Sequence, residues 1–121
     1  MGTEPDNELL IQGHLRTLRL EKGLSQHTAA AYGRDLRQFA GFLATSDTGL
    51  LDASGEQIRS FLGAGEWRPS TRARKTAALR SFYKDAVLSS RLKADPTRSL
   101  AGVRLESDLP KVLTVSQYLQ T

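Results

Sequence analysis

The sequence contains no cysteine and only two histidines, His14 and His27. Disulfide bridges and thiolate metal sites are therefore excluded, and a reducing, cytoplasmic location is the simplest interpretation. Neither histidine has a second histidine or a carboxylate at metal-ligand spacing, so no metal site is expected. No apolar run approaches the roughly 18 residues of a membrane span, and the first residues lack the pattern of a signal peptide. We therefore expect no membrane-spanning segment.

Catalytic motifs are missing as well. The sequence has neither a G-x-S-x-G nucleophile motif nor a Walker-type phosphate loop. Gly63 and Gly65 are too few for a phosphate-binding fingerprint and are interpreted as a helix stop. His14 lies beside an apolar stripe, where a packed neutral histidine is the preferred interpretation. We therefore expect a binding module with no catalytic residue and no cofactor, not an enzyme complete in itself.

Positive charge is concentrated in the second half of the chain. The 17 lysines and arginines against 13 acidic residues give a net charge of +4. Residues 66–104 hold ten basic and three acidic residues, whereas residues 1–65 hold six and eight. Such an asymmetry suggests a polyanion as partner, either nucleic acid or a membrane surface. A basic face that meets only solvent is the alternative interpretation.

Apolar residues at helical spacing predict an all-α fold. The expected helices cover residues 7–22, 26–44, 55–65 and 71–89. A short polar residue precedes each helix as its expected N-cap: Asp6, Ser25, Ser54 and Ser70. Gly23 is expected to close the first helix in the left-handed conformation, and Trp67 to cover the edge of the core. No alternating run of β-branched residues predicts a strand.

The last predicted helix combines an apolar arc with an outward face. Leu79, Phe82 and Tyr83 belong to the arc, and the residues nearly opposite are Arg74, Ala77, Ser81 and Lys84. A cation near the start of a helix, with small residues beside it, is well placed to bind phosphate, and Arg74 fits this description best. The helix over residues 26–44 repeats the design, with His27, Ala30, Arg34, Arg37 and Gly41 outward. Helices of this kind can enter a DNA major groove.

Three other cations of the last helix have a second interpretation. Arg72 and Lys75 lie over the apolar stripe, where their aliphatic stems can simply cover apolar surface. Arg80 lies at the edge of the stripe and either pairs internally with Asp35 or contacts phosphate. Asp35 itself is interpreted as structural.

Several segments resemble one protein family. The stretch "GLSQHTAAAYGRDLRQFAGFL" resembles a helix of tyrosine recombinases of the phage integrase type. The shared positions are Gly23, Leu24, Ser25, Thr28, Tyr32, Asp35, Leu36 and Phe39. "ARKTAALRSFYKDAV" is similar to a block of the Xer-type recombinases, and "ADPTRSL" and "LPKVLT" resemble two further segments in the same order. Thr76 and Asp85 depart from this pattern, since apolar residues are usual there.

The resemblance implies a core-binding domain, which is a four-helix SAM-like bundle with a short C-terminal linker tail. In the family, this domain and a catalytic domain clamp a DNA duplex from opposite sides, and the second and fourth helices face the major groove. The catalytic arginines, lysine, histidines and nucleophilic tyrosine are not matched in this sequence, and Tyr118 is not the nucleophile. The resemblance therefore implies double-stranded DNA as partner, and other recombinase protomers through the full-length protein.

The end of the sequence predicts that a further domain follows. Thr114 and Gln117 form a capping box, a strong helix-start signal, yet the chain stops about one turn later. We therefore expect residues 1–107 to be the core-binding domain, and residues 108–121 to be a linker and the start of a truncated catalytic domain.

The sequence thus predicts the DNA-binding N-terminal domain of a site-specific tyrosine recombinase, used in DNA recombination and integration. The alternative is a helical protein-interaction module with a basic docking face. The residues expected to contact DNA are Ser25, His27, Thr28, Arg34, Arg37, Ser70, Thr71, Arg72, Arg74, Lys75, Arg80 and Lys111.

Overall fold

The computed structural model describes residues 6–100, and every regular element in this range is helical. The α-helices are α1 (Asn7–Leu20), α2 (Gln26–Ala44), α3 (Gly55–Ala64) and α4 (Pro69–Leu88). Two short 3₁₀ helices complete the order, η1 (Leu50–Asp52) and η2 (Pro96–Ser99). The predicted all-α fold is therefore confirmed. Lys111, the capping box at Thr114 and the domain boundary at residue 107 lie outside the described residues.

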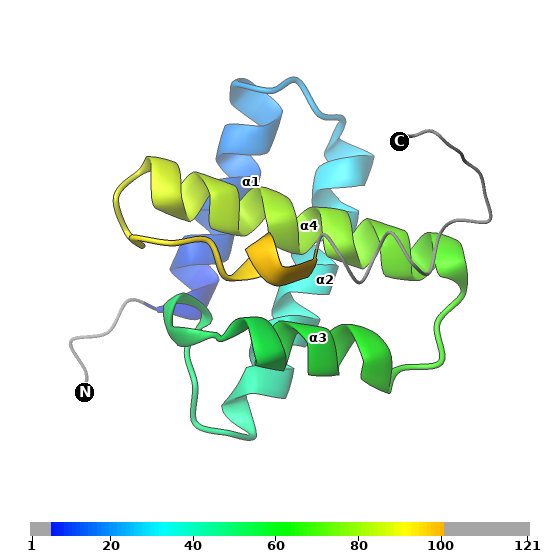
Figure 1. Ribbon diagram of the computed structural model, residues 1–121. Coiled ribbons are helices and arrows are strands. Elements are labelled where there is room, and N and C mark those ends of the chain that lie inside the picture. Colours follow the sequence, from blue (N-terminus) through cyan, green and yellow to red (C-terminus); the bar gives the residue numbers. More distant parts are fainter. Residues whose placement is uncertain (1–5, 101–121) are drawn as a thin grey trace, which may run out of the picture.

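The four α-helices pack with α4 across the others. Figure 1 shows α1 and α2 side by side, with α4 crossing both and α3 running along the lower flank of α4. Helices α2 and α4 each contact the other three α-helices. Among residues 6–100, no helix combines the length and apolar character needed to cross a membrane.

Three of the predicted N-caps are confirmed. The Asp6 carboxylate accepts a hydrogen bond from the backbone N–H of Glu8, and the Ser25 hydroxyl accepts one from Thr28. Ser54 and Gln57 form a reciprocal capping box at the start of α3. Each cap satisfies backbone donors that would otherwise lack a partner.

The predicted start of α4 was wrong. The helix begins at Pro69 with Arg68 as its N-cap, and no side chain caps it. Proline lacks the N–H that goes unpaired in the first turn, and its fixed φ suits the first helical position. The start at Pro69 places Ser70 inside the first turn. Helix α1 ends at Leu20, two residues early, while Gly23 adopts the expected left-handed φ of 71°.

The core lies where α4 meets the other helices. Leu36 and Phe39 of α2, Ile58 of α3 and Leu79 of α4 are all buried there. Tyr83 is fully buried, and its hydroxyl donates a 2.6 Å hydrogen bond to the carbonyl of Leu50. This bond satisfies both polar groups inside an apolar setting and ties η1 to α4.

Candidate nucleic-acid interface

Arg74, the cation expected to reach outward most clearly, is paired inside the molecule. Its Nε donates to Oδ2 of Asp35 at 2.8 Å, and its Nη2 donates to Oδ1 at 2.9 Å. This pairing was not expected from the sequence, and the phosphate contact of Arg74 stays a prediction. The helical periodicity placed Arg74 outside the apolar arc, but it could not show that α2 presents a carboxylate at that edge. The side chain still keeps 40% of its surface exposed.

Lys75 completes the ion cluster around Asp35. Its Nζ donates to Oδ1 of Asp35 at 2.8 Å and also to Gln38, and it lies 4.9 Å from the centre of the Trp67 ring. Burial raises the pKa of Asp35, but the hydrogen bonds from Arg74 and Lys75 outweigh it and leave that pKa lowered. Because the Lys75 side chain is only 7% exposed, its structural interpretation is favoured over a DNA contact.

Arg72 also has an internal role. Its Nε donates to the carbonyl of Leu62 at 3.0 Å, and its Nη2 donates to that of Gly65 at 3.3 Å. Carbonyl groups in the last turn of a helix lack intrahelical partners, so Arg72 satisfies two acceptors at the end of α3. It thereby connects the start of α4 to the end of α3.

Arg80 does not form the internal pair that the sequence left open. The Asp35 carboxylate accepts from Arg74 and Lys75 instead. The Nη2 atom of Arg80 is buried without a hydrogen-bond partner among the described residues, although the residue as a whole is half-buried. The pairing with Asp35 was therefore wrong, and the phosphate contact stays a prediction.

Helix α2 presents its cations as expected, with one exception. His27 and Arg34 are exposed, and within residues 6–100 neither has a hydrogen-bond or ion-pair partner. Arg37 instead forms a bidentate pair with Glu8 of α1, at 3.0 Å from Nε and 2.6 Å from Nη2. Hydrogen bonding to Arg37 lowers the pKa of Glu8 and correspondingly raises that of Arg37.

The predicted hydroxyl contacts lie at the starts of the same two helices. Ser25 and Thr28 are exposed, and the Ser25 hydroxyl is also 3.1 Å from that of Thr28. Ser70 is exposed and Thr71 half-buried in the first turn of α4.

Arg68, which was not among the predicted contacts, is exposed directly before the first turn of α4. Its place before Pro69 is the signal that could have found it, because proline favours the first helical position.

The outward residues of α2 and α4 that flank the Asp35–Arg74 contact are here called the α2–α4 face. His27, Ala31 and Arg34 recur at helical spacing on α2, next to the Asp35 edge that contacts α4. Ser70, Arg74 and Ala77 recur likewise on α4. The α2–α4 face is defined by His27, Ala31, Arg34, Ser70, Arg74 and Ala77. Small residues between the cations leave room for a close approach.

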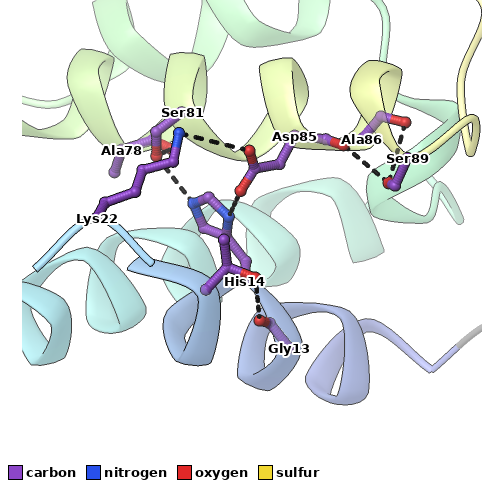
Figure 2. Close-up of polar contacts among 9 residues, drawn as sticks. Gly13, His14, Lys22, Ala78, Ser81, Asp85, Ala86 and Ser89 are labelled. Carbon is purple, nitrogen blue, oxygen red and sulfur yellow. Dashed lines mark hydrogen bonds and ion pairs between the residues drawn. The ribbon is translucent and has the colours of Figure 1, made fainter. Parts of the chain in front are cut away.

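Ser81 was expected on this outward face, but it belongs to a second polar cluster. Figure 2 shows His14 of α1 between two side chains of α4. His14 Nδ1 is 2.7 Å from Oδ2 of Asp85, and Nε2 is 2.9 Å from the Ser81 hydroxyl. Lys22 lies 3.8 Å from the other Asp85 oxygen. The carboxylate accepts from Nδ1–H of the neutral ring. The Ser81 hydroxyl is also 3.1 Å from the Ala78 carbonyl, and its one hydrogen serves either that carbonyl or Nε2.

His14 is buried, as predicted from its place beside the apolar stripe. Burial lowers its pKa, and this effect outweighs the opposing attraction of Asp85. The neutral form is therefore favoured near pH 7. The cluster also explains how Asp85 fits a position where an apolar residue is usual, because the carboxylate joins α4 to α1 through His14.

The sequence that forms the all-α bundle matches a known class of domain. Residues 11–89, which run from α1 to just past the end of α4, match the family model "Phage integrase, N-terminal SAM-like domain". The chain belongs to this family, as its sequence motifs predicted.

Curated relatives agree with this assignment. The chain is 35% identical over 108 residues to the tyrosine recombinase XerD of Rhizobium meliloti, covering 87% of this chain and 35% of that protein. It is 38% identical over 109 residues to the tyrosine recombinase XerC of Pelobacter propionicus, covering 86% of this chain and 35% of that protein. The chain thus spans about a third of the length of these relatives. No solved structure matches it significantly.

Proposed function

We propose that this chain is the DNA-holding N-terminal domain of a site-specific tyrosine recombinase. In this proposal the α2–α4 face contacts a DNA duplex, and a catalytic domain of the full-length protein cuts and rejoins the strands. Protomers of the full-length recombinase assemble on the DNA in the cytoplasm. The observation that carries the proposal is the family match over residues 11–89, which includes both helices of the basic face.

The chemistry of the α2–α4 face supports contacts with the phosphate backbone. Arg34 and Arg74 expose guanidinium groups, which bind phosphate oxygens through charge-assisted hydrogen bonds. Ala31 and Ala77 are small enough to let the helices approach a duplex closely. Phosphate contacts release counterions from DNA, so the affinity should fall steeply with salt.

An anisotropy titration of a fluorescent DNA duplex at two salt concentrations tests this proposal. Arg34→Ala is expected to weaken binding about five- to tenfold and to reduce the salt slope by about one, because one phosphate contact is lost. Arg16→Ala provides the matched control, since Arg16 is an exposed arginine on α1, outside the α2–α4 face. Equal losses for both variants, or no binding by the unchanged chain, would count against the proposal.

A protein-docking module is the second candidate. Leu9, Leu20 and Leu88 are the large apolar side chains most exposed among the described residues, at 65%, 76% and 70%, and they are what such a module would offer a protein partner. A module that docks a protein through these residues would not bind duplex DNA with the salt dependence described above. The titration therefore separates the two functions.

A further inference from the structure

The Asp35 carboxylate uses only one edge of the Arg74 guanidinium. An arginine has five N–H groups arranged on a planar fork, and Asp35 accepts from two of the nitrogen atoms, Nε and Nη2. The remaining N–H groups belong to a side chain that is 40% exposed. Arg74 can therefore bind an anion on its outer edge without leaving Asp35.

The positive charge of Arg74 is not cancelled by this pairing. Asp35 also accepts from Lys75, and both of these side chains are almost fully buried, at 2% and 7% exposed. The buried carboxylate and the buried ammonium balance each other. One positive charge is left, and it belongs to Arg74, the exposed member of the cluster.

We infer that Asp35 is a positioning residue for DNA binding, because it fixes Arg74 in the orientation that places its outer edge against a phosphate oxygen. The inference rests on the proposed function of the α2–α4 face. Holding an arginine in its bound rotamer removes much of the entropy cost of binding, which raises affinity without adding a contact. It leads to an unusual expectation, since removing a negative charge from a DNA-binding surface ordinarily strengthens binding.

A double-mutant cycle measures whether Asp35 acts through Arg74. The unchanged chain, Asp35→Asn, Arg74→Ala and the double variant are each titrated with one fluorescent DNA duplex at fixed salt. We expect Asp35→Asn to weaken binding about fivefold, and to have no further effect once Arg74 is alanine. Affinity that is unchanged or stronger in Asp35→Asn overturns the inference. The inference also fails if Asp35→Asn weakens binding by the same factor when Arg74 has already been replaced by alanine. If the unchanged chain fails to bind, the proposed function itself fails.

Asp35→Asn leaves Lys75 buried without its counter-charge, which destabilises the fold. A second variant, at Arg74, tests the inference while the buried Asp35–Lys75 pair stays intact. Arg74→Lys keeps the positive charge and leaves the Asp35 carboxylate in place. A single ammonium group, however, cannot bind Asp35 through one edge and a phosphate through the other, as a guanidinium can. The inference expects Arg74→Lys to lose about as much affinity as Arg74→Ala. Arg16→Lys makes the same chemical change on α1 and should leave binding unchanged. Full affinity in Arg74→Lys would show that charge alone suffices and would overturn the inference.

Discussion

Arg72, Arg74 and Lys75 lie within four positions of each other on α4, yet their side chains have three different environments. Arg72 binds carbonyl groups at the end of α3, Lys75 is buried beside Trp67, and Arg74 lies half-exposed on the α2–α4 face. The differences arise from what each neighbouring element offers, which is a carbonyl, an aromatic ring or a carboxylate. At the scale of single residues, charge in the sequence is therefore a poor measure of charge at the surface.

Protonation of His14 should weaken the fold in mildly acidic solution. Burial lowers the pKa of His14 below its ordinary 6.5, whereas the unfolded chain keeps the ordinary value. As pH falls through 6.5 the unfolded state binds the proton more readily, so the free energy of unfolding decreases until the folded-state pKa is passed. Urea unfolding between about pH 7.5 and pH 5.5, above the range where most carboxylates titrate, measures this decrease.

Two variants decide whether His14 is responsible. His14→Gln retains a side chain that can bond to Asp85 and Ser81, but it should remove the decrease in this pH range. His27→Gln removes the other histidine, which is exposed, and the decrease in the free energy of unfolding should persist in this variant. A decrease that persists in His14→Gln would contradict the explanation.

At the scale of elements, the contact between the end of α3 and the start of α4 depends on close packing. Gly65 ends α3, and a Cβ atom there would come within 2.4 Å of the Trp67 ring. Trp67 cannot move away easily, because its ring packs against Phe61 with 5.3 Å between centroids and lies beneath Lys75. The glycine is required by the neighbouring ring and not by its own backbone, whose φ is −91°.

Gly65→Ala is therefore expected to destabilise the fold by about 1–3 kcal/mol, the usual cost of overpacking. Gly63→Ala is the matched control within α3, since a Cβ at Gly63 would meet open space and alanine favours a helix. Urea unfolding of both variants provides the comparison. Equal stability of the two variants would show that the Trp67 ring does not constrain Gly65.

The elements predicted best were those set by local interactions. Ser25 and Ser54 are followed at the right distance by the backbone and side-chain groups that they bind, so the starts of α2 and α3 were predicted correctly. The start of α4 was missed because Ser70 was preferred over Pro69, although proline fits the first helical position better. Such errors arise when two start signals lie next to each other.

For the whole molecule, helical periodicity was sufficient to predict an all-α bundle, because α1, α2 and α3 each have a clear apolar stripe. Helix α4 is less amphipathic, but Leu79, Phe82 and Tyr83 still mark its buried side. Contacts between distant residues were harder to predict, since Asp35 and Arg74 are 39 positions apart and His14 and Asp85 are 71 apart. Periodicity gives the direction of a side chain relative to its own helix, but it does not show which neighbour lies there. Several cations of the predicted site are therefore paired within the molecule, and the DNA contacts of α2 and α4 stay a prediction.

A chemical-shift titration of the isotopically labelled chain with a short DNA duplex tests the central claim most directly, because it identifies the bound surface residue by residue. The account predicts that the largest amide shifts occur at His27, Arg34, Ser70 and Arg74, and that they diminish as salt is added. Largest shifts around Leu9, Arg16 and Leu20 on the exposed side of α1, or no shifts at all, would contradict it.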